Sequence, residues 1–391
     1  MRYYTAGESH GQGLVAIVED VPAGLKISEE QINVDLARRQ AGYGRGGRMK
    51  IEHDMVQVIS GVRFGRTIGS PVAMLVANRD WANWTDRMAP FGEPPLDLAR
   101  EVTPRPGHAD LVGALKTNTD DCRNILERSS ARTTAPRVAA AGIAREFLAD
   151  LGVEIFSYVT GIGSAVMRED DPFMNPSRYT PLEIETSEVR CPDAETSEAM
   201  KREIDRAIKD KDSLGGTFRV IVRGLLPGVG GYAVPTERLT STIGGALFSI
   251  PAIKGVEFGM GFEAARKPGS QVHDPILLDR AKAEFTRASN NAGGLEGGMT
   301  TGMPLVVTAA MKPIPTLMQP LQTVNLDTLE VAQASKERSD VCAVPACAVV
   351  AEGEVAFAIA DAYMRKFGSD NMADIKAAIK AYKQRLNTVS R

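Results

Sequence analysis

Residues 129–152 read SSARTTAPRVAAAGIAREFLADLG, a polar start followed by an apolar repeat. The repeat predicts an amphipathic helix that opens near residue 131. Its apolar stripe, read at helical spacing, consists of Val138, Ala139, Ile143, Phe147 and Leu148. The polar start gathers serines and arginines at the helix entrance, where free amides, hydroxyls and guanidinium groups form an anion site. An ordinary N-cap with solvated arginines is the alternative.

Strand and helix patterns lie on both sides of this helix. Strands are predicted at residues 14–20, 71–80, 216–225 and 304–311. Helices are predicted at 28–42, with Ser28 as N-cap and Gln31 in a capping box, at 195–212, and from about 345 onward, the last at 371–386. The spacing is not a regular βαβ repeat, and no GxGxxG follows a strand and opens a helix. These patterns predict an α+β fold rather than a Rossmann sheet.

The bulk composition is that of a globular protein. Of the 391 residues, 43% are hydrophobic and 24% are charged, and 46 Lys and Arg oppose 49 Asp and Glu for a net charge of −3. This balance argues against general nucleic-acid binding, which needs a basic face. No apolar run approaches the ~20 residues that span a bilayer, and the N-terminal stretch has no secretory core. We therefore expect neither nucleic acid nor membrane as a partner.

The spacing of the cysteines and histidines is typical neither of a disulfide framework nor of a metal site. No CxxC pair occurs, which predicts reduced thiols in a cytoplasmic protein. No histidine pairs at ligand spacing with a cysteine or another histidine, so we expect no metal. The residues concerned are Cys122, Cys191, Cys342 and Cys347, and His10, His53, His108 and His273.

Residues 40–53, QAGYGRGGRMKIEH, combine glycine with concentrated positive charge. Together with Arg38 and Arg39, the thirteen residues 38–50 hold five cations and no carboxylate. Glycines give a ligand access to the backbone, and arginines give bidentate donors to phosphate or carboxylate. An RGG-like RNA-binding segment is the alternative, but only two such units occur and Tyr43 is the one interleaved aromatic residue. We interpret the loop as an anion clamp.

Two histidines lie in glycine- or proline-rich segments that are typical of catalytic sites. His10 is flanked by glycines in AGESHGQG (6–13), just before a predicted strand. His108 follows two prolines and a glycine in TPRPGHADL (103–111), at the start of a predicted helix whose positive end would lower its pKa. For each, a structural or capping histidine is the alternative.

Two further segments indicate ligand contacts. NNAGGLEGGMTTG (290–302) and KPIPT (312–316) offer backbone and hydroxyl donors that suit a flat polar ligand, although a glycine-rich hairpin is the alternative for the first. In KERSDVCAVPAC (336–347), Asp340 is either a proton acceptor near a ligand or the ion-pair partner of Arg338, since the two share one side if extended.

Each segment is weak alone, but together and in this order they resemble the chorismate synthase family. The matching stretches are GESHG, GYGRGGRMKIE, RPGHADL, ERSSARTTA, SIPAIKGVEFG (249–259), NNAGGLEGG, KPIPT and ERSDVCAVP. They cover residues 5 to about 350 without a large gap. One departure is Pro251 and Ala252, where some relatives carry Gln-Ala, so that a main-chain contact would survive and a glutamine side-chain contact would not.

The resemblance implies a carbon–oxygen lyase acting on phosphates. Its members convert 5-enolpyruvylshikimate 3-phosphate to chorismate by an anti-1,4-elimination of phosphate, which requires reduced FMN without net redox change. This is the last common step of the shikimate pathway and aromatic amino-acid biosynthesis. Such flavoproteins are typically homotetramers with a β-α-β sandwich fold, for which we expect antiparallel sheets with helices on the outside.

Carried onto this sequence, the resemblance also implies residue roles. His10 would protonate the leaving phosphate, His108 would protonate the reduced flavin, and Asp340 would accept a proton from it. Substrate or NADP contacts would come from Arg39, Arg45 and Arg48. Flavin contacts would come from Arg128, Ser129, Ser130, Ala252, Gly297, Lys312, Pro313, Ile314, Pro315, Thr316 and Arg338.

These motifs scatter along the chain, so one site built from them requires a single interwoven catalytic domain over residues 1–391, with a polar peripheral excursion near 160–215. Some relatives reduce the flavin with NADPH and others rely on a separate flavin reductase. No extra reductase domain is visible, so we expect an external source. Two rivals remain open, namely another flavin- or phosphate-dependent lyase on this scaffold and an RNA-binding protein that uses GRGGR.

Overall fold

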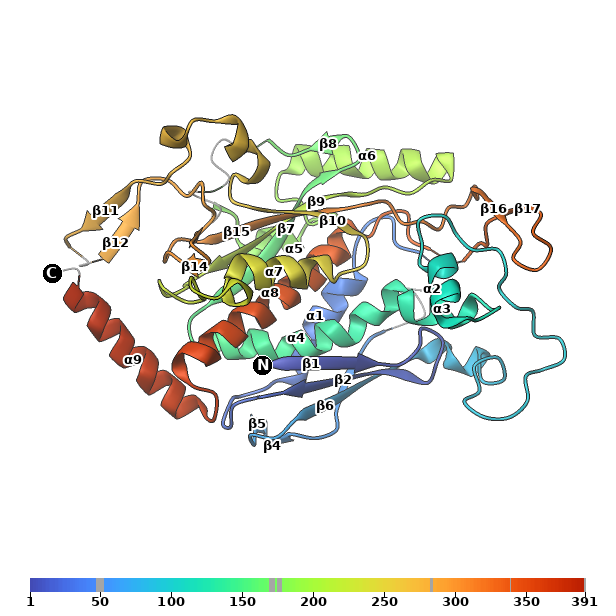
Figure 1. Ribbon diagram of the computed structural model, residues 1–391, viewed down its shortest axis with the longest axis horizontal. Helices are drawn as coiled ribbons and strands as arrows, with labels where there is room; N and C mark the ends of the chain where they lie inside the picture. Colours follow the sequence, from blue (N-terminus) through green and yellow to red (C-terminus); the bar gives the residue numbers. More distant parts are fainter. Residues whose placement is uncertain (47–52, 169–172, 174–177, 282–283, 338, 390–391) are drawn as a thin grey trace.

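Two antiparallel sheets face each other across a layer of helices in the computed structural model (Figure 1). The first sheet contains, in spatial order, β1 (Arg2–Ala6), β2 (Gly13–Glu19), β6 (Val72–Ala77) and β3 (Val56–Val58). The second contains β10 (Ile253–Phe258), β15 (Leu305–Met311), β9 (Gly216–Arg223), β7 (Glu154–Ile162) and β8 (Ala165–Val166). The structure describes residues 1–46, 53–168, 173, 178–281, 284–337 and 339–389.

The layer between the sheets holds α1 (Glu29–Gln40), α4 (Thr134–Asp150), α7 (Leu239–Phe248) and α8 (Val344–Phe367). Helix α4 packs on β2 and β6, α8 packs on β7 and β9, and the two helices pack on each other. The predicted mixed fold with antiparallel sheets is confirmed. The predicted position of the helices on the outside is wrong for these four, because they carry apolar residues that the two sheets cover from opposite sides.

The helix predicted near residue 131 begins with a 3₁₀ turn at Ala131–Thr133 and continues as α4. All five residues of its predicted stripe are buried, but so are alanines on its other faces, since α1, α8 and the first sheet surround it. Glycines bring the helices close. A Cβ on Gly142 would lie 2.5 Å from Ile32 Cγ1, and one on Gly353 would lie 2.5 Å from the Cβ of Ala141.

Most predicted elements occur within a few residues of their predicted bounds. Strands β2, β6, β9 and β15 and helices α1, α6 (Ala194–Asp210), α8 and α9 (Met372–Val389) correspond to predicted segments. The Ser28 hydroxyl accepts a hydrogen bond from the Gln31 amide at 3.2 Å and caps α1. Strand β7 has no predicted counterpart. Nearly all of its residues are buried on both faces, so it lacks the alternation that marks a half-buried strand.

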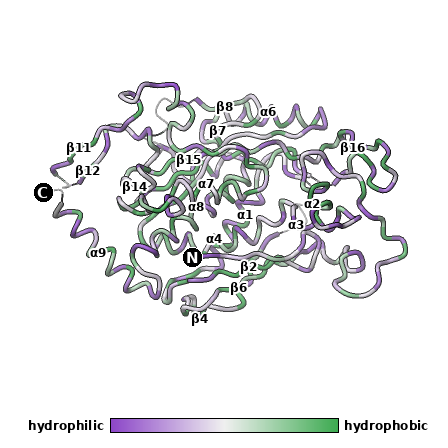
Figure 2. Tube along the Cα trace, in the orientation of Figure 1, coloured by the Kyte–Doolittle hydropathy of each residue, from purple (hydrophilic) through white to green (hydrophobic). Residues whose placement is uncertain are grey.

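Residues 160–215 include the end of β7, β8, α5 (Pro181–Glu185) and α6. Helix α6 packs on β7 and β8 through Met200, Ile204 and Ala207, on the side of the second sheet away from α8 (Figure 1). Hydrophobic and hydrophilic residues alternate along the peripheral helix α9, as Figure 2 shows. Both helices therefore bury one face and solvate the other.

The remaining elements are short. Helices α2 (Asp110–Thr117) and α3 (Arg123–Ser129) lie at the end of the helical layer where α4 begins (Figure 1). Two-stranded ribbons pair β4 (Val62–Arg63) with β5 (Arg66–Thr67), β11 (Ile276–Asp279) with β12 (Glu284–Arg287), β13 (Leu295–Glu296) with β14 (Met299–Thr300), and β16 (Gln322–Val324) with β17 (Val331–Gln333).

Candidate active site

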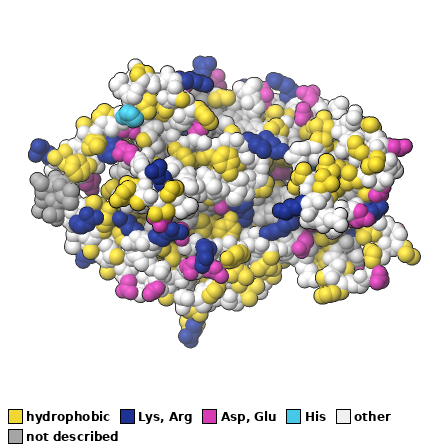
Figure 3. Space-filling view, viewed as in Figure 1, with side chains coloured by type: hydrophobic (Ala, Val, Ile, Leu, Met, Phe, Trp, Pro, Cys, Tyr) yellow, Lys and Arg dark blue, Asp and Glu magenta, His cyan; other side chains and the backbone are white. Residues whose placement is uncertain are grey.

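A cavity of about 400 Å³ lies where α1 ends, α2, α4 and α8 begin and β15 ends. Most of the predicted site residues line it: His10, His108, Asp340, Arg39, Arg45, Ser129, Ser130, Ala252, Lys312, Ile314, Pro315 and Thr316. They come from segments that span most of the chain. Lys and Arg side chains also gather near the middle of the face shown in Figure 3.

Other predicted contacts do not reach this cavity. Arg128 is exposed, and its guanidinium donates to the carbonyl of Thr5 at 2.6 Å. Gly297 lies in the turn between β13 and β14, with a left-handed φ of +58°. Pro313 follows a lining residue but does not line the cavity itself. The predictions for Arg48 and Arg338 lie outside the described residues.

His10 is almost fully enclosed on the wall of the cavity. Its Nδ1 lies 2.8 Å from Glu127 Oε1, and its backbone N–H donates to Glu127 Oε2 at 2.7 Å. The ring also stacks on Trp84, with centroids 4.0 Å apart. Burial raises the pKa of Glu127, but the hydrogen bonds from His10 outweigh it and leave that pKa below its usual value. Glu127 is therefore an anion that fixes the ring.

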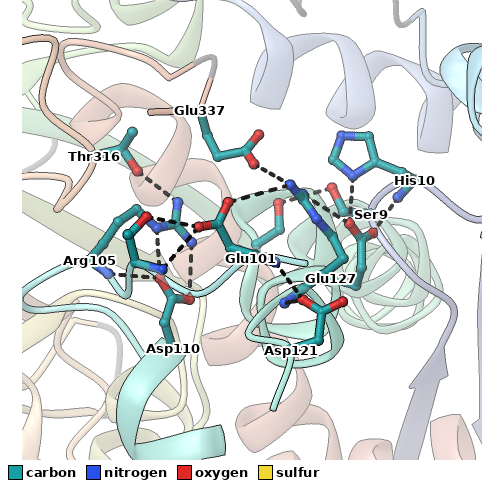
Figure 4. Close-up of polar contacts among 12 residues, drawn as sticks. Ser9, His10, Glu101, Arg105, Asp110, Asp121, Glu127, Thr316 and Glu337 are labelled. Atoms are coloured by element: carbon teal, nitrogen blue, oxygen red, sulfur yellow. Dashed lines mark hydrogen bonds and ion pairs between the residues drawn. The ribbon is translucent and has the colours of Figure 1, made fainter. Parts of the chain in front are cut away.

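His108 has a second carboxylate partner. Its Nδ1 lies 2.5 Å from Asp110 Oδ1, in the first turn of α2. Arg105 is buried beside them and donates from Nε to Asp110 Oδ2 at 2.8 Å and from Nη1 to Thr316 at 2.9 Å (Figure 4). Burial raises the pKa of Asp110, but the hydrogen bonds from His108 and Arg105 hold it well below its usual range.

The described part of the glycine-arginine loop contacts Asp340. Arg45 Nη1 lies 2.8 Å from Asp340 Oδ2, and the backbone N–H of Gly46 donates to Oδ1 at 2.6 Å. The partner of Asp340 in the described residues is thus Arg45, which lies far away in the sequence. Asp340 therefore lies at the loop that we interpreted as an anion clamp.

The sequence alone had indicated unpaired cations in residues 38–50, but the described ones, Arg38, Arg39 and Arg45, pair with carboxylates. Arg39 donates to the buried Asp54 at 2.7 Å, and Arg132 from α4's entrance donates to the other oxygen of the same carboxylate. Burial lowers the pKa of Arg39, and Asp54 opposes that shift. Burial alone would raise the pKa of Asp54. The positive charges of Arg39 and Arg132 lower it by more, so the pKa of Asp54 lies below its usual value. Two guanidinium groups around one carboxylate leave a net positive charge at the cavity.

Arg38 belongs to a different site. Its guanidinium donates to both oxygens of Glu352 on α8, at 2.8 and 2.9 Å, inside the helical layer. It does not line the cavity. Adjacent arginines of the predicted clamp therefore serve different purposes, because successive side chains of α1 point in different directions.

The cavity lining also includes one lysine, Lys312, and apolar side chains. The apolar residues include Leu126, Ile250, Met311 and Val350. Ala252 has a left-handed φ of +72°, and its carbonyl accepts a hydrogen bond from the Lys312 amide at 2.9 Å. Burial lowers the pKa of Lys312, with a further contribution from Lys254. A positive φ at a residue that is not glycine is strained and is common at binding sites.

The sequence analysis did not identify the residues that hydrogen-bond to the lining histidines and hold their rings. Glu127, Asp110 and Arg105 lie inside quoted motifs but received no role. Asp110 had a local signal, its position two residues after His108. Glu127 had none, because its contact with His10 joins residues 117 positions apart. Glu337 was also missed; it lines the cavity and accepts from Arg123 at 2.7 Å.

Metal and membrane features were searched within the described residues. No group of three or more His, Cys, Asp or Glu side chains there is arranged to hold a metal ion. No helix in that part of the chain has the length and apolar character needed to cross a bilayer.

Comparisons with known proteins agree on one family. The sequence profile of the chorismate synthase family matches residues 1–364. A chorismate synthase from Aquifex aeolicus is 50% identical over 387 residues, covering 98% of this chain and 97% of the relative. One from Bacillus velezensis is 52% identical, covering 98% and 99%.

A solved structure gives the same result at the level of the fold. The crystal structure of a chorismate synthase superimposes with a TM-score of 0.80 at 40% identity, covering 99% of this chain and 98% of the other. Identity of this extent along the whole chain also makes the protein an enzyme. The chain therefore belongs to the chorismate synthase family of lyases.

Proposed function

We propose that this protein converts 5-enolpyruvylshikimate 3-phosphate to chorismate by 1,4-elimination of phosphate with reduced FMN. The observation that carries the proposal is one cavity lined by His10, His108 and Asp340 together with several cations. The substrate carries two carboxylates and a phosphate, and the cofactor adds another phosphate. An acidic protein needs a concentrated cationic site to bind two such anions.

The cavity fits a flavin in size and in chemistry. Its volume of about 400 Å³ falls in the range of ligand sites, which are mostly apolar with a few placed polar groups. The apolar wall near Ile250 and Met311 suits a flat ring system, and the backbone around Ala252 and Lys312 offers polar contacts. When bound, reduced FMN would lend an electron to the substrate and recover it as phosphate departs.

The residues of the chain would bind the substrate and move protons. Arg39, Arg45 and Arg132 would hold its anionic groups and stabilise the charge that develops on the departing phosphate. As the carbon–oxygen bond breaks, its electron pair goes to the phosphate, and a proton from His10 neutralises part of that charge. The ring C–H bond breaks as well: its electron pair completes the new double bond, and the proton would leave by way of the cofactor to Asp340. His108 and Asp340 would hold the protons exchanged with the cofactor.

The test is phosphate release from 5-enolpyruvylshikimate 3-phosphate under anaerobic conditions. Parallel reactions contain chemically reduced FMN, oxidised FMN, or oxidised FMN with NADPH. Release with reduced FMN but not with oxidised FMN alone supports the proposal. Additional release with NADPH and oxidised FMN would identify an intrinsic reductase and contradict our expectation of an external source. No release in any reaction from folded, flavin-binding protein would refute the proposed substrate.

The proposal extends to assembly and location. We propose a homotetramer in the cytoplasm, by similarity to the family. The four cysteines are buried and free, which suits a reducing compartment. Sedimentation equilibrium measures the mass of the assembly, and a monomer at micromolar concentration would contradict the tetramer.

A further inference from the structure

Glu127 of α3 contacts both residues of the Ser9–His10 segment. The Ser9 amide donates to the Glu127 carbonyl at 3.0 Å. The His10 amide donates to Glu127 Oε2 at 2.7 Å, and the His10 ring contacts Oε1 at 2.8 Å. Glu127 thus uses its backbone and both carboxylate oxygens on two consecutive residues.

The ring of His10 is restrained from two directions. Trp84 covers one face, with the rings inclined by 30°. Glu127 holds Nδ1, and Figure 4 shows the other ring nitrogen on the side of the ring away from Glu127. The Glu127 side chain is only 2% exposed, so water does not compete for this contact.

Hydrogen-bond chemistry then decides which nitrogen carries the proton. An ionised carboxylate only accepts hydrogen bonds, so Nδ1 facing it must carry hydrogen. In the neutral ring, Nε2 is therefore the unprotonated nitrogen. In the charged ring, Nε2–H is the proton directed away from Glu127.

We infer that Glu127 is the positioning residue of His10: it selects the ring tautomer that leaves Nε2 as the proton-donating and proton-accepting atom of the site. This inference rests on the proposed function for its kinetic consequence. Glu127 itself does not line the cavity. It would act only through His10, by stabilising the charged ring before the proton moves to phosphate and by holding its orientation.

Substitution by glutamine separates this role from simple packing. Glu127 receives two N–H donors from His10, one from the backbone and one from the ring. The amide in Glu127→Gln has nearly the same shape but only one acceptor oxygen, and its NH₂ is a donor. If the oxygen keeps the backbone bond, the NH₂ faces Nδ1. The ring must then give up hydrogen at Nδ1 and carry it on Nε2.

The first measurement is the nitrogen NMR spectrum of histidine-labelled protein. The chain has four histidines, and a His10→Asn sample assigns the His10 signals. In the wild-type enzyme with a neutral His10 ring, we expect protonated Nδ1 and unprotonated Nε2. In Glu127→Gln, we expect the reverse. A wild-type ring with hydrogen on Nε2 would overturn the inference, whether or not the variant folds.

The second measurement is steady-state phosphate release with reduced FMN. We expect Glu127→Gln to lower kcat at least about tenfold with little change in KM, because general acid catalysis contributes 10²–10⁴-fold. The matched control is Glu101→Gln, which removes a carboxylate 4.0 Å from the neighbouring Arg123 but does not line the cavity. We expect its kcat to stay within about twofold of the wild type, since Glu101 is half-buried outside the cavity and its side chain accepts from Thr103 rather than from a lining residue.

The outcomes separate the two proposals. Wild-type enzyme without phosphate release would refute the proposed function and leave the NMR result to decide the tautomer. Active wild-type enzyme with an unchanged kcat and tautomer in Glu127→Gln would refute the positioning role alone. An equal fall of kcat in Glu101→Gln would also refute it, because the effect would then come from general disruption of the α3 network.

Discussion

Individual side chains in the cavity are held by partners that do not line it. Asp110 lies behind His108 as Glu127 lies behind His10, and Asp54 lies behind Arg39. These carboxylates are buried, and hydrogen bonds or guanidinium charges keep them ionised. Preformed orientation of this kind removes the cost of ordering a side chain during the reaction.

Replacement of Asp110 by asparagine tests the second histidine. Asp110 accepts hydrogen bonds from Arg105 and contacts Nδ1 of His108. In Asp110→Asn only one of the two side-chain positions is an acceptor oxygen, because the other becomes an NH₂ group. That NH₂ would face either Arg105 or His108 and could not accept a hydrogen bond there. We expect kcat for phosphate release to fall at least about tenfold. Steady-state kinetics at saturating reduced FMN measure this change. An unchanged kcat would contradict the idea that Asp110 orients His108 for the reaction.

Replacement of Arg45 by methionine tests the anion site. Arg45 lines the cavity and pairs with Asp340 at 2.8 Å. Loss of a charge-assisted contact costs about 1.5–3 kcal/mol, so we expect KM for the substrate to rise roughly tenfold or more. The control is Arg100→Met, an exposed arginine paired with Asp120 and Asp327 outside the cavity. Equal KM values for the two variants would contradict a role of Arg45 in binding.

The helices of the central layer pack through small residues. On α4 and α8, alanine and glycine allow close approach, and Gly353 faces Ala141 at the crossing. The small side chains also explain why more residues of α4 are buried than the predicted apolar stripe contains. A helix surrounded by other elements buries every face, so periodicity in its sequence marks only part of the contact.

Substitution of Gly353 by alanine tests this crossing. The new Cβ would lie 2.5 Å from the Ala141 Cβ, which cannot rotate away. Overpacking costs about 1–3 kcal/mol, against a gain of up to about 1 kcal/mol in helix propensity, so we expect net destabilisation. The matched control is Gly245→Ala on α7, where the added Cβ would have no atom of the described residues within 4 Å, apart from its chain neighbours and the backbone of its own helix. Thermal unfolding should show a lower Tm for the first variant and an equal or higher Tm for the second.

The whole molecule is joined near its centre by an ionic cluster around Glu352. This carboxylate on α8 is fully buried and receives Arg38 from α1, Arg145 from α4 and Arg190 from the segment before α6. The Ser157 hydroxyl on β7 also donates to it, at 2.6 Å. Helices and sheet therefore meet at one side chain.

Acid should weaken this junction. Burial raises the pKa of Glu352, but Arg38, Arg145 and Arg190 lower it much further, so it lies well below its usual range. A folded-state pKa below the unfolded value of 4.5 means that the stabilisation is complete above that pH and is lost as the pH falls. We expect the unfolding free energy to decrease below about pH 5. Denaturant titrations at several pH values and one protein concentration measure it.

Glu352→Gln isolates the contribution of this residue. The variant removes the counter-charge that the buried Arg190 shares with the half-buried Arg38 and Arg145. Asp35 and Glu185 still pair with these arginines, so we expect a loss of up to about 3–5 kcal/mol at pH 7. It should also lose part of the pH dependence below about pH 5. A variant as stable as the wild type, or one with the same acid dependence, would show that Glu352 does not hold the layers together.

The sequence by itself determined the local elements and the chemistry of the motifs. Caps, apolar spacing and glycine placement act over a few residues, so the Ser28 cap and the strands β2, β6, β9 and β15 were predictable. The resemblance of the ordered motifs to one family could also be recognised from the sequence, because each motif consists of a few consecutive residues.

Only the tertiary structure decided which residues meet. Glu127 with His10, Asp340 with Gly46 and Glu352 with Arg38 join residues 117, 294 and 314 positions apart. The placement of α4 and α8 between the sheets is decided in the same way. Burial and ion pairing depend on distances in space that no local pattern encodes, so the layers and the partners of the site arise only when the chain folds.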